Sequence, residues 1–199
     1  GNQSSNLDVS LVEDDALYER FEAFIGQGIR FQYSGWIFDG ILSNIREVKS
    51  HSINRGWEVT ISDPRSLLEG VQLIIDGYTG YTYSVPNLYN IFGYLESFGY
   101  GSSLKNESGI PWKLVRDAFT QLNQIVPIYL GGQPYYIDLS LLPNIQNDFR
   151  IGGGTSITLL GFIQSICDLA NHEFTVVMTG NYITVITVSN NIPQLNGSI

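Results

Sequence analysis

The sequence has few charged side chains and no clustered cations. Charged residues make up 15% of its 199 residues, against about a quarter in an average soluble protein. Ten lysines and arginines stand against 19 acidic residues, which gives a net charge of −9, and no two cations are adjacent. Because binding to a phosphate backbone requires clustered cations, we expect no nucleic-acid partner.

Cysteine, histidine and long apolar runs are also scarce. Cys167 is the only cysteine, so no disulfide can form within the chain, and we expect its thiol to be buried and unreactive. His51 and His172 have no carboxylate or cysteine at ligand spacing, so we expect no metal site and no cofactor. No apolar run reaches about 18 residues, so no segment is expected to span a membrane.

Motifs that would carry a reaction are missing as well. The run Gly152-Gly153-Gly154-Thr155-Ser156 lacks the lysine of a phosphate-binding loop, so we interpret it as a turn followed by a helix cap at Thr155 or Ser156. The neighbouring acids Asp14 and Asp15 suit the start of a helix. A wall hydrolase would require two carboxylates that face each other across a cleft. We therefore expect no catalytic residues and do not expect an enzyme.

Alternating side chains in the N-terminal half predict an antiparallel meander. Residues 29–33, 36–43 and 57–62 each alternate with a period of two, which is the period of a β-strand. Ser34-Gly35 predicts a tight turn between the first two strands. The turn motif Asp63, Pro64 and Arg65 then ends the sheet, and with Asp63 as N-cap it predicts a short helix over 65–69.

The C-terminal third predicts a β-α-β-β unit, with a strand over 135–141, a helix up to about 170, and strands over 174–178 and 182–188. We expect an α+β protein in which a small β-barrel-like antiparallel sheet domain with a helical insert precedes a two-layer β-α-β-β domain. The expected divisions are an N-terminal helix and tail (1–26), the barrel-like domain (27–130, insert 78–126), the β-α-β-β domain (131–190) and a tail (191–199).

Aromatic side chains are concentrated between residues 57 and 100. Rings with an apolar body and a polar tip suit a protein interface, a packed core or a surface that stacks on sugars, and the sequence leaves all three open. The candidate interface residues are Trp57, Tyr78, Tyr81, Tyr83, Tyr89, Tyr94 and Tyr100.

Two parts of the chain resemble modules of known families. The runs 31–42 and 57–68 resemble the phage tail hub or baseplate hub family of late-control proteins, which shares its β-barrel modules with type VI secretion spikes. The β-α-β-β pattern between residues 135 and 188 is similar to the amino-terminal domain of outer-membrane secretins.

The resemblance implies a structural virion protein of a phage tail. Its partners would be other tail or baseplate proteins, and the full-length protein would form a homo-oligomeric ring. No catalytic residue carries over from the family. The alternative is a binding module of the bacterial cell envelope, either secretin-like or specific for carbohydrate or peptidoglycan. The polar ends and the initial Gly1 suggest an excerpt of a longer protein.

Overall fold

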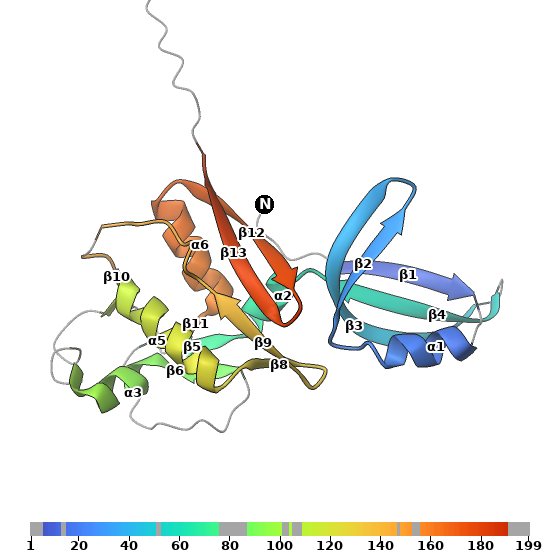
Figure 1. Cartoon of the computed structure of the whole chain (residues 1–199), viewed down its shortest axis with the longest axis horizontal. Coiled ribbons are helices and arrows are strands. Elements are labelled where there is room, and N and C mark those ends of the chain that lie inside the picture. The colour runs from blue at the N-terminus through green and yellow to red at the C-terminus, as the bar shows by residue number, and fades with distance from the viewer. Residues whose placement is uncertain are drawn as a thin grey trace, which may run out of the picture.

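The protein has a mixed α+β fold in which a curled antiparallel sheet stands beside a larger unit of helices and sheets (Figure 1). The structure, a computed structural model, describes residues 6–12, 15–50, 53–75, 87–100, 104, 109–146, 148–152 and 156–190. We call residues 6–62 the half-barrel and residues 63–190 the larger unit. The expected α+β class with a barrel-like sheet is confirmed.

The half-barrel is a four-stranded antiparallel sheet in the order β1-β4-β3-β2. Its strands are β1 (Asn6–Val12), β2 (Gly28–Tyr33), β3 (Trp36–Ser50) and β4 (Ile53–Ser62). The sheet curls without closing, because its end strands β1 and β2 do not pair with each other among the described residues. It is therefore barrel-like rather than a closed barrel.

A short helix covers part of the inner face of this sheet. α1 (Asp15–Glu22) lies beneath β3 and β4 in Figure 1, and its Tyr18 ring stacks on Trp57 with centroids 4.1 Å apart. The buried cluster of the half-barrel consists of Leu42, Ile45, Trp57, Val59 and Ile61. Residues 6–25, expected to be a helix and tail apart from the barrel, thus supply a strand and a helix to it.

The larger unit gathers short strands and helices around one extensive hydrophobic cluster. Its first elements are α2 (Arg65–Glu69), β5 (Gln72–Ile74), β6 (Leu88–Asn90), α3 (Ile91–Leu95), the wider turn η1 (Glu96–Tyr100), β7 (Ile110–Pro111) and α5 (Trp112–Ile125). Two small sheets tie these elements to the C-terminal part. One has the order β11-β5-β6, with β11 at Ile157–Thr158, and the other pairs β7 with β10 at Arg150–Ile151. α5, with 14 residues, lies in the insert over residues 78–126 that the sequence predicts to be helical.

The C-terminal elements form the predicted β-α-β-β unit. They are β8 (Ile128–Leu130), β9 (Gln133–Asp138), β10 (Arg150–Ile151), β11 (Ile157–Thr158), α6 (Leu159–Leu169), β12 (His172–Thr179) and β13 (Tyr182–Ser189). The sheet order is β12-β13-β9-β8, with β9 and β13 parallel. Thr158, rather than Thr155 or Ser156, caps α6, because its side-chain oxygen accepts a hydrogen bond from the Gly161 amide at 2.9 Å.

The predicted turn motif joins the two units. The helix α2 forms where expected, but Pro64 occupies the N-cap position. The Asp63 carboxylate instead bridges the turn: it accepts a hydrogen bond from the Arg65 amide at 2.8 Å and pairs with the Arg65 guanidinium at 2.6 Å. The Asp63 side chain thus accepts from an amide of the first turn, as that of an N-cap residue does, with Pro64 between it and the first residue of α2.

The units meet at a close backbone contact. Gly26 has a φ of +83°, and a side chain there would collide with the Leu130 carbonyl. The Tyr135 hydroxyl donates a hydrogen bond to the Gly26 carbonyl, and Ile41 of β3 packs into the cluster of the larger unit. The domain limits expected at residues 26 and 130 stay predictions.

Candidate assembly surface

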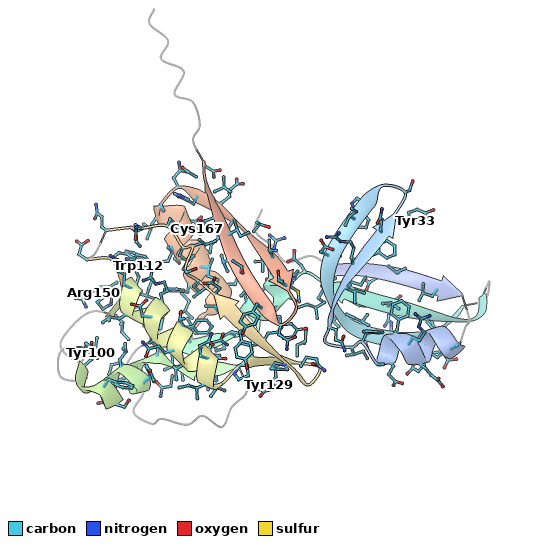
Figure 2. All side chains as sticks on the ribbon, viewed as in Figure 1. Tyr33, Tyr100, Trp112, Tyr129, Arg150 and Cys167 are labelled. Carbon is cyan, nitrogen blue, oxygen red and sulfur yellow. The ribbon has the colours of Figure 1, made fainter. Side chains whose placement is uncertain are left out.

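Most of the candidate interface aromatics that the structure describes are buried. Trp57, Tyr89 and Tyr94 are each less than a tenth exposed, so they belong to the core and offer almost no area to a partner. Tyr100, at the end of η1, is 45% exposed (Figure 2). The other three candidates, Tyr78, Tyr81 and Tyr83, lie outside the described residues.

The hydroxyl groups of Tyr89 and Tyr94 both form hydrogen bonds within the protein. Tyr89 donates to the Val126 carbonyl at 2.6 Å and accepts from Asn123 at 3.2 Å. Burial raises the pKa of Tyr89 to about 12. Tyr94 donates to the Gln121 side chain at 2.6 Å. Core packing, one of the three interpretations left open by the sequence, therefore holds for these two residues.

The most exposed aromatic side chain of the described residues, Tyr33, lies instead on the β2–β3 hairpin. In its register Tyr33 faces Trp36, and Phe31 faces Phe38. Directly opposed residues point to the same side of a sheet, so all four rings share one face. The Trp36 ring lies 6.3 Å from Phe31 and 6.0 Å from Phe38 between centroids. We call these four residues the aromatic hairpin face.

The outer end of this face is uncovered. Tyr33 is 72% exposed and Trp36 is 53% exposed. Figure 2 places Tyr33 on the hairpin, away from the larger unit. Phe31 and Phe38, nearer the base, pack against the half-barrel cluster. The rings therefore run from the core out to the tip.

The turn of the hairpin fixes this arrangement. Ser34 and Gly35 have φ angles of 47° and 82°, and positive φ at both central residues is the mark of a type I′ turn, whose twist matches the flanking strands. A two-residue turn leaves one register, which puts Tyr33 opposite Trp36. The sequence around residues 34–35 thus dictates that the aromatic rings gather.

Charge is absent from the hairpin tip. The segment 31–38 has no charged side chain. The nearest ions are Arg30 and Asp39, paired across the strands with a nitrogen–oxygen distance of 2.6 Å. Arg30 lies between Ile29 and Phe31 in its strand, so it points to the opposite side of the sheet from the aromatic rings. The pair of hydrogen bonds from Arg30 lowers the pKa of Asp39.

A groove lies where the half-barrel meets the larger unit. Its volume is about 620 Å³, and it is lined from one side by β2 residues 28–30 and from the other by β12 residues 176–178. The turn at Gly180-Asn181 also contributes to its wall. The groove holds one cation and one anion, Arg30 and Asp39, which pair with each other.

The single thiol of the chain lies in the core. Cys167 is fully buried, and burial, together with the nearby Asp168, raises the pKa of its thiol to about 11. No three histidine, cysteine or acidic side chains are grouped as metal ligands in the part of the chain that the structure describes. Within the same residues, no helix has both the length and the apolarity to cross a membrane.

Sequence reasoning identified the hairpin but missed its surface. The alternation in residues 29–43 and the turn at 34–35 together imply that residues 31, 33, 36 and 38 share one face, and this signal was available. The candidate interface residues were chosen from the tyrosine-rich stretch between 57 and 100, and the described rings of that stretch are mainly buried.

Comparison with protein-family models finds no match, and no curated protein matches the sequence.

Proposed function

We propose that the chain is a structural component of a phage tail hub or a related injection machine, and that it acts by assembly with other proteins. The observation that carries this proposal is the uncovered aromatic hairpin face, with Tyr33 72% and Trp36 53% exposed. Exposed aromatic clusters of this kind are typical of protein interfaces. The resemblance to hub proteins supplies the kind of assembly.

The size of the hairpin face favours a multi-contact assembly over an isolated pair. An aromatic side chain buries about 150–250 Å² when fully covered, so Tyr33 and Trp36 together offer only a few hundred Å². A stable interface needs about 800 Å² per partner. The hairpin is therefore one contact among several, as in a subunit that touches more than one neighbour.

The open edges of the sheets support the same proposal. β1, β2, β12 and β8 are end strands of their sheets within the described residues. Unpaired edges are a hazard in an isolated protein, and neighbours in an assembly can cover them. The scarcity of charge, at 15% of residues, also suits a surface buried among other subunits.

Assembly with genomic neighbours tests the proposal. The longest natural polypeptide that contains this sequence would be mixed with the products of adjacent genes and measured by multi-angle light scattering and negative-stain imaging. We expect defined rings or tail complexes, and we expect the double variant Tyr33→Ser/Trp36→Ser to reduce their yield at least tenfold. Tyr129→Ser, which removes an exposed aromatic from β8, is the matched control. A strict monomer that binds no neighbour contradicts the proposal.

The alternative is a carbohydrate-binding module of the cell envelope. The same exposed rings favour it, because Tyr33 and Trp36 could stack on a sugar, and Tyr136 and Tyr182 form a second ring pair with centroids 5.4 Å apart. A ligand that binds the native state raises its melting temperature. If peptidoglycan fragments raise the melting temperature of the protein and Trp36→Ser abolishes the rise, the envelope function replaces the hub.

A further inference from the structure

The groove between the half-barrel and the larger unit has the size of a small-molecule site. Its volume is about 620 Å³, and ligand sites of about 300–1,000 Å³ occur preferentially where two structural units meet. The turn that joins β12 to β13 points toward the half-barrel in Figure 1 and forms part of the wall. The two walls touch where Gly28 meets Met178, since a Cβ added to Gly28 would stand 3.1 Å from the Met178 methyl carbon. The groove is closed along this contact and suits a compact ligand.

The ion pair in the groove offers donors and acceptors without a net charge. Arg30 donates from Nε and one Nη nitrogen to the two carboxylate oxygens of Asp39, at 2.6 and 2.8 Å. A guanidinium has five N–H groups and a carboxylate about four acceptor sites, so each partner keeps unused hydrogen-bonding capacity. The two side chains are 64% and 56% exposed, and an exposed pair of this kind adds little to stability. Its remaining donors and acceptors are therefore open to a ligand.

Two side-chain amides on the wall formed by the larger unit have the same dual character. Gln133 of β9 and Asn181 of the β12–β13 turn line the groove. Within the part of the chain that the structure describes, neither side chain has a hydrogen-bond partner. Each amide supplies two donors and an acceptor oxygen. The backbone of Asn181 is held in place, because its carbonyl accepts a hydrogen bond from the Tyr136 amide at 2.9 Å.

The sheet face beside the groove carries a stacked pair of tyrosine rings. Tyr182 lies opposite Thr179 of β12 and next to Tyr136 of β9 in the register, so the three side chains share one face. The rings of Tyr136 and Tyr182 stack with centroids 5.4 Å apart. Because β13 lies between β9 and β12, Tyr136 covers the Tyr182 ring on the β9 side, and the other ring face is turned toward β12, which lines the groove. Tyr182 is 56% exposed and directly follows Asn181.

The chemistry of these groups favours an uncharged ligand rich in hydroxyl groups. An anion would have to displace Asp39 from Arg30 in a chain of net charge −9, and a cation would have to displace Arg30 from Asp39. A hydroxyl group both donates and accepts, which matches the ion pair and the two amides. An exposed aromatic ring face suits the C–H face of a sugar ring. We propose that the groove binds a neutral carbohydrate chain, with one sugar unit held by the ion pair and the two amides and a neighbouring unit stacked on Tyr182.

This inference goes beyond the proposed assembly role and does not rest on it. It also differs in place from a sugar bound to the aromatic hairpin face. Arg30 and Asp39 point to the opposite side of the sheet from those rings, so a sugar in the groove leaves Tyr33 and Trp36 uncovered. Assembly through the hairpin and sugar binding in the groove are therefore separable by mutation.

A glycan array tests the class of ligand. The chain of 199 residues would be applied to an array of neutral and acidic glycans, and the neutral glycan that binds most strongly would be titrated by calorimetry. We expect at least tenfold weaker binding by Tyr182→Ser and by the double variant Gln133→Ala/Asn181→Ala, which removes both amides from the groove. The matched controls are Trp36→Ser, which removes an exposed ring from the hairpin, and Gln124→Ala, which removes an exposed amide from α5. Both controls should bind like the unaltered chain, and melting without sugar shows that each variant is folded.

Amide chemical shifts locate the ligand without any substitution. When the same glycan is added to the isotope-labelled chain, the signals of Gly28 and Asn181 should move, while those of Ser34 and Gly35 at the hairpin tip should not. Absence of binding to every neutral glycan, a preference for acidic glycans, or shifts confined to the hairpin overturns the inference. Loss of binding in Trp36→Ser, with binding kept in the groove variants, assigns the sugar to the aromatic hairpin face instead. Sugar binding in the groove leaves the hub function to be decided by the assembly experiment.

Discussion

The half-barrel and the larger unit differ in the size of their buried cores. The larger unit buries Trp112, Phe119 and Phe162 in one extensive cluster and leaves Phe98, Tyr129 and Tyr182 exposed at its surface. The half-barrel has a cluster of five buried residues and exposes Tyr33 and Trp36 side by side at the tip of its hairpin. The comparison indicates that most of the buried contacts belong to the larger unit and that the half-barrel gathers two exposed rings on one face.

A first prediction concerns the dependence of the half-barrel on the larger unit. Phe119 is fully buried and contacts Tyr89 edge-on, with centroids 5.0 Å apart. Phe119→Ala should lower the free energy of unfolding by about 3–5 kcal/mol. Because a core of five residues is marginal for an independent domain, we expect the half-barrel to unfold at the same lowered urea concentration.

Tryptophan fluorescence can separate the two units. Trp112 lies in the larger unit, and its indole nitrogen is buried without a hydrogen-bond partner among the described residues, so Trp112→Phe removes no hydrogen bond of that nitrogen within this part of the chain. In this background the fluorescence reports only Trp36 and Trp57 of the half-barrel. An unchanged fluorescence midpoint in Phe119→Ala, together with an earlier loss of helical circular dichroism, contradicts the dependence.

A second prediction concerns the polar link inside the larger unit. The fully buried Asn123 accepts a hydrogen bond from the Ile137 amide at 2.7 Å and donates to Tyr89 at 3.2 Å. Asn123→Ala leaves a buried amide unsatisfied, so we expect a loss of about 2–3 kcal/mol in urea unfolding. The exposed neighbour Gln124 is the control, since Gln124→Ala should change stability by less than about 0.5 kcal/mol. Equal losses in both variants contradict a linking role.

A third prediction is a loss of stability in alkali. Tyr89 has its pKa raised to about 12 from an unfolded value near 10, so the unfolded chain releases this proton first as the pH rises. Its contribution is complete below pH 10 and is lost as the pH passes through about 12, by about 2–3 kcal/mol. Tyr89→Phe should flatten this decline in unfolding experiments between pH 9 and 11.5, while Tyr33→Phe, exposed on the hairpin of the half-barrel, should not.

The elements of the fold were easier to predict than the surface. Local periodicity of apolar residues predicts both the strand over residues 57–62 and the helix over residues 112–125, and this periodicity is visible in the sequence itself. The roles of Tyr89 and Trp57 depend on α5 and α1 packing over them, and such contacts between distant segments leave no local pattern. The pairing of β1 with β4 joins Asn6 to Ser62. Leu7, Val9 and Leu11 alternate with polar residues, which indicates a strand, but no local pattern identifies the strand with which it pairs.

A fourth prediction concerns the turn between the two units. Asp63 accepts a hydrogen bond from the Arg65 amide and pairs with its guanidinium. Asp63→Ala should cost about 1 kcal/mol, as for the loss of a helix cap. Asp63→Asn keeps the bond to the amide and should recover about half of that loss. An Asn variant as unstable as the Ala variant would assign the whole effect to the ion pair, contrary to expectation.

The smallest loss of folding stability is expected from a substitution at Trp36, an exposed ring of the half-barrel. Trp36→Ala removes a ring that is 53% exposed, and we expect a loss of stability below about 1 kcal/mol, since its ring contacts are with Phe31 and Phe38, which are only partly buried. Trp57→Ala, in the same sheet but 6% exposed, should cost about 3–5 kcal/mol. Chemical unfolding of both variants measures the difference. A large aromatic residue that the fold does not need is explained by a partner that covers it, so a loss at Trp36 as large as that at Trp57 would show that the hairpin rings serve the half-barrel itself.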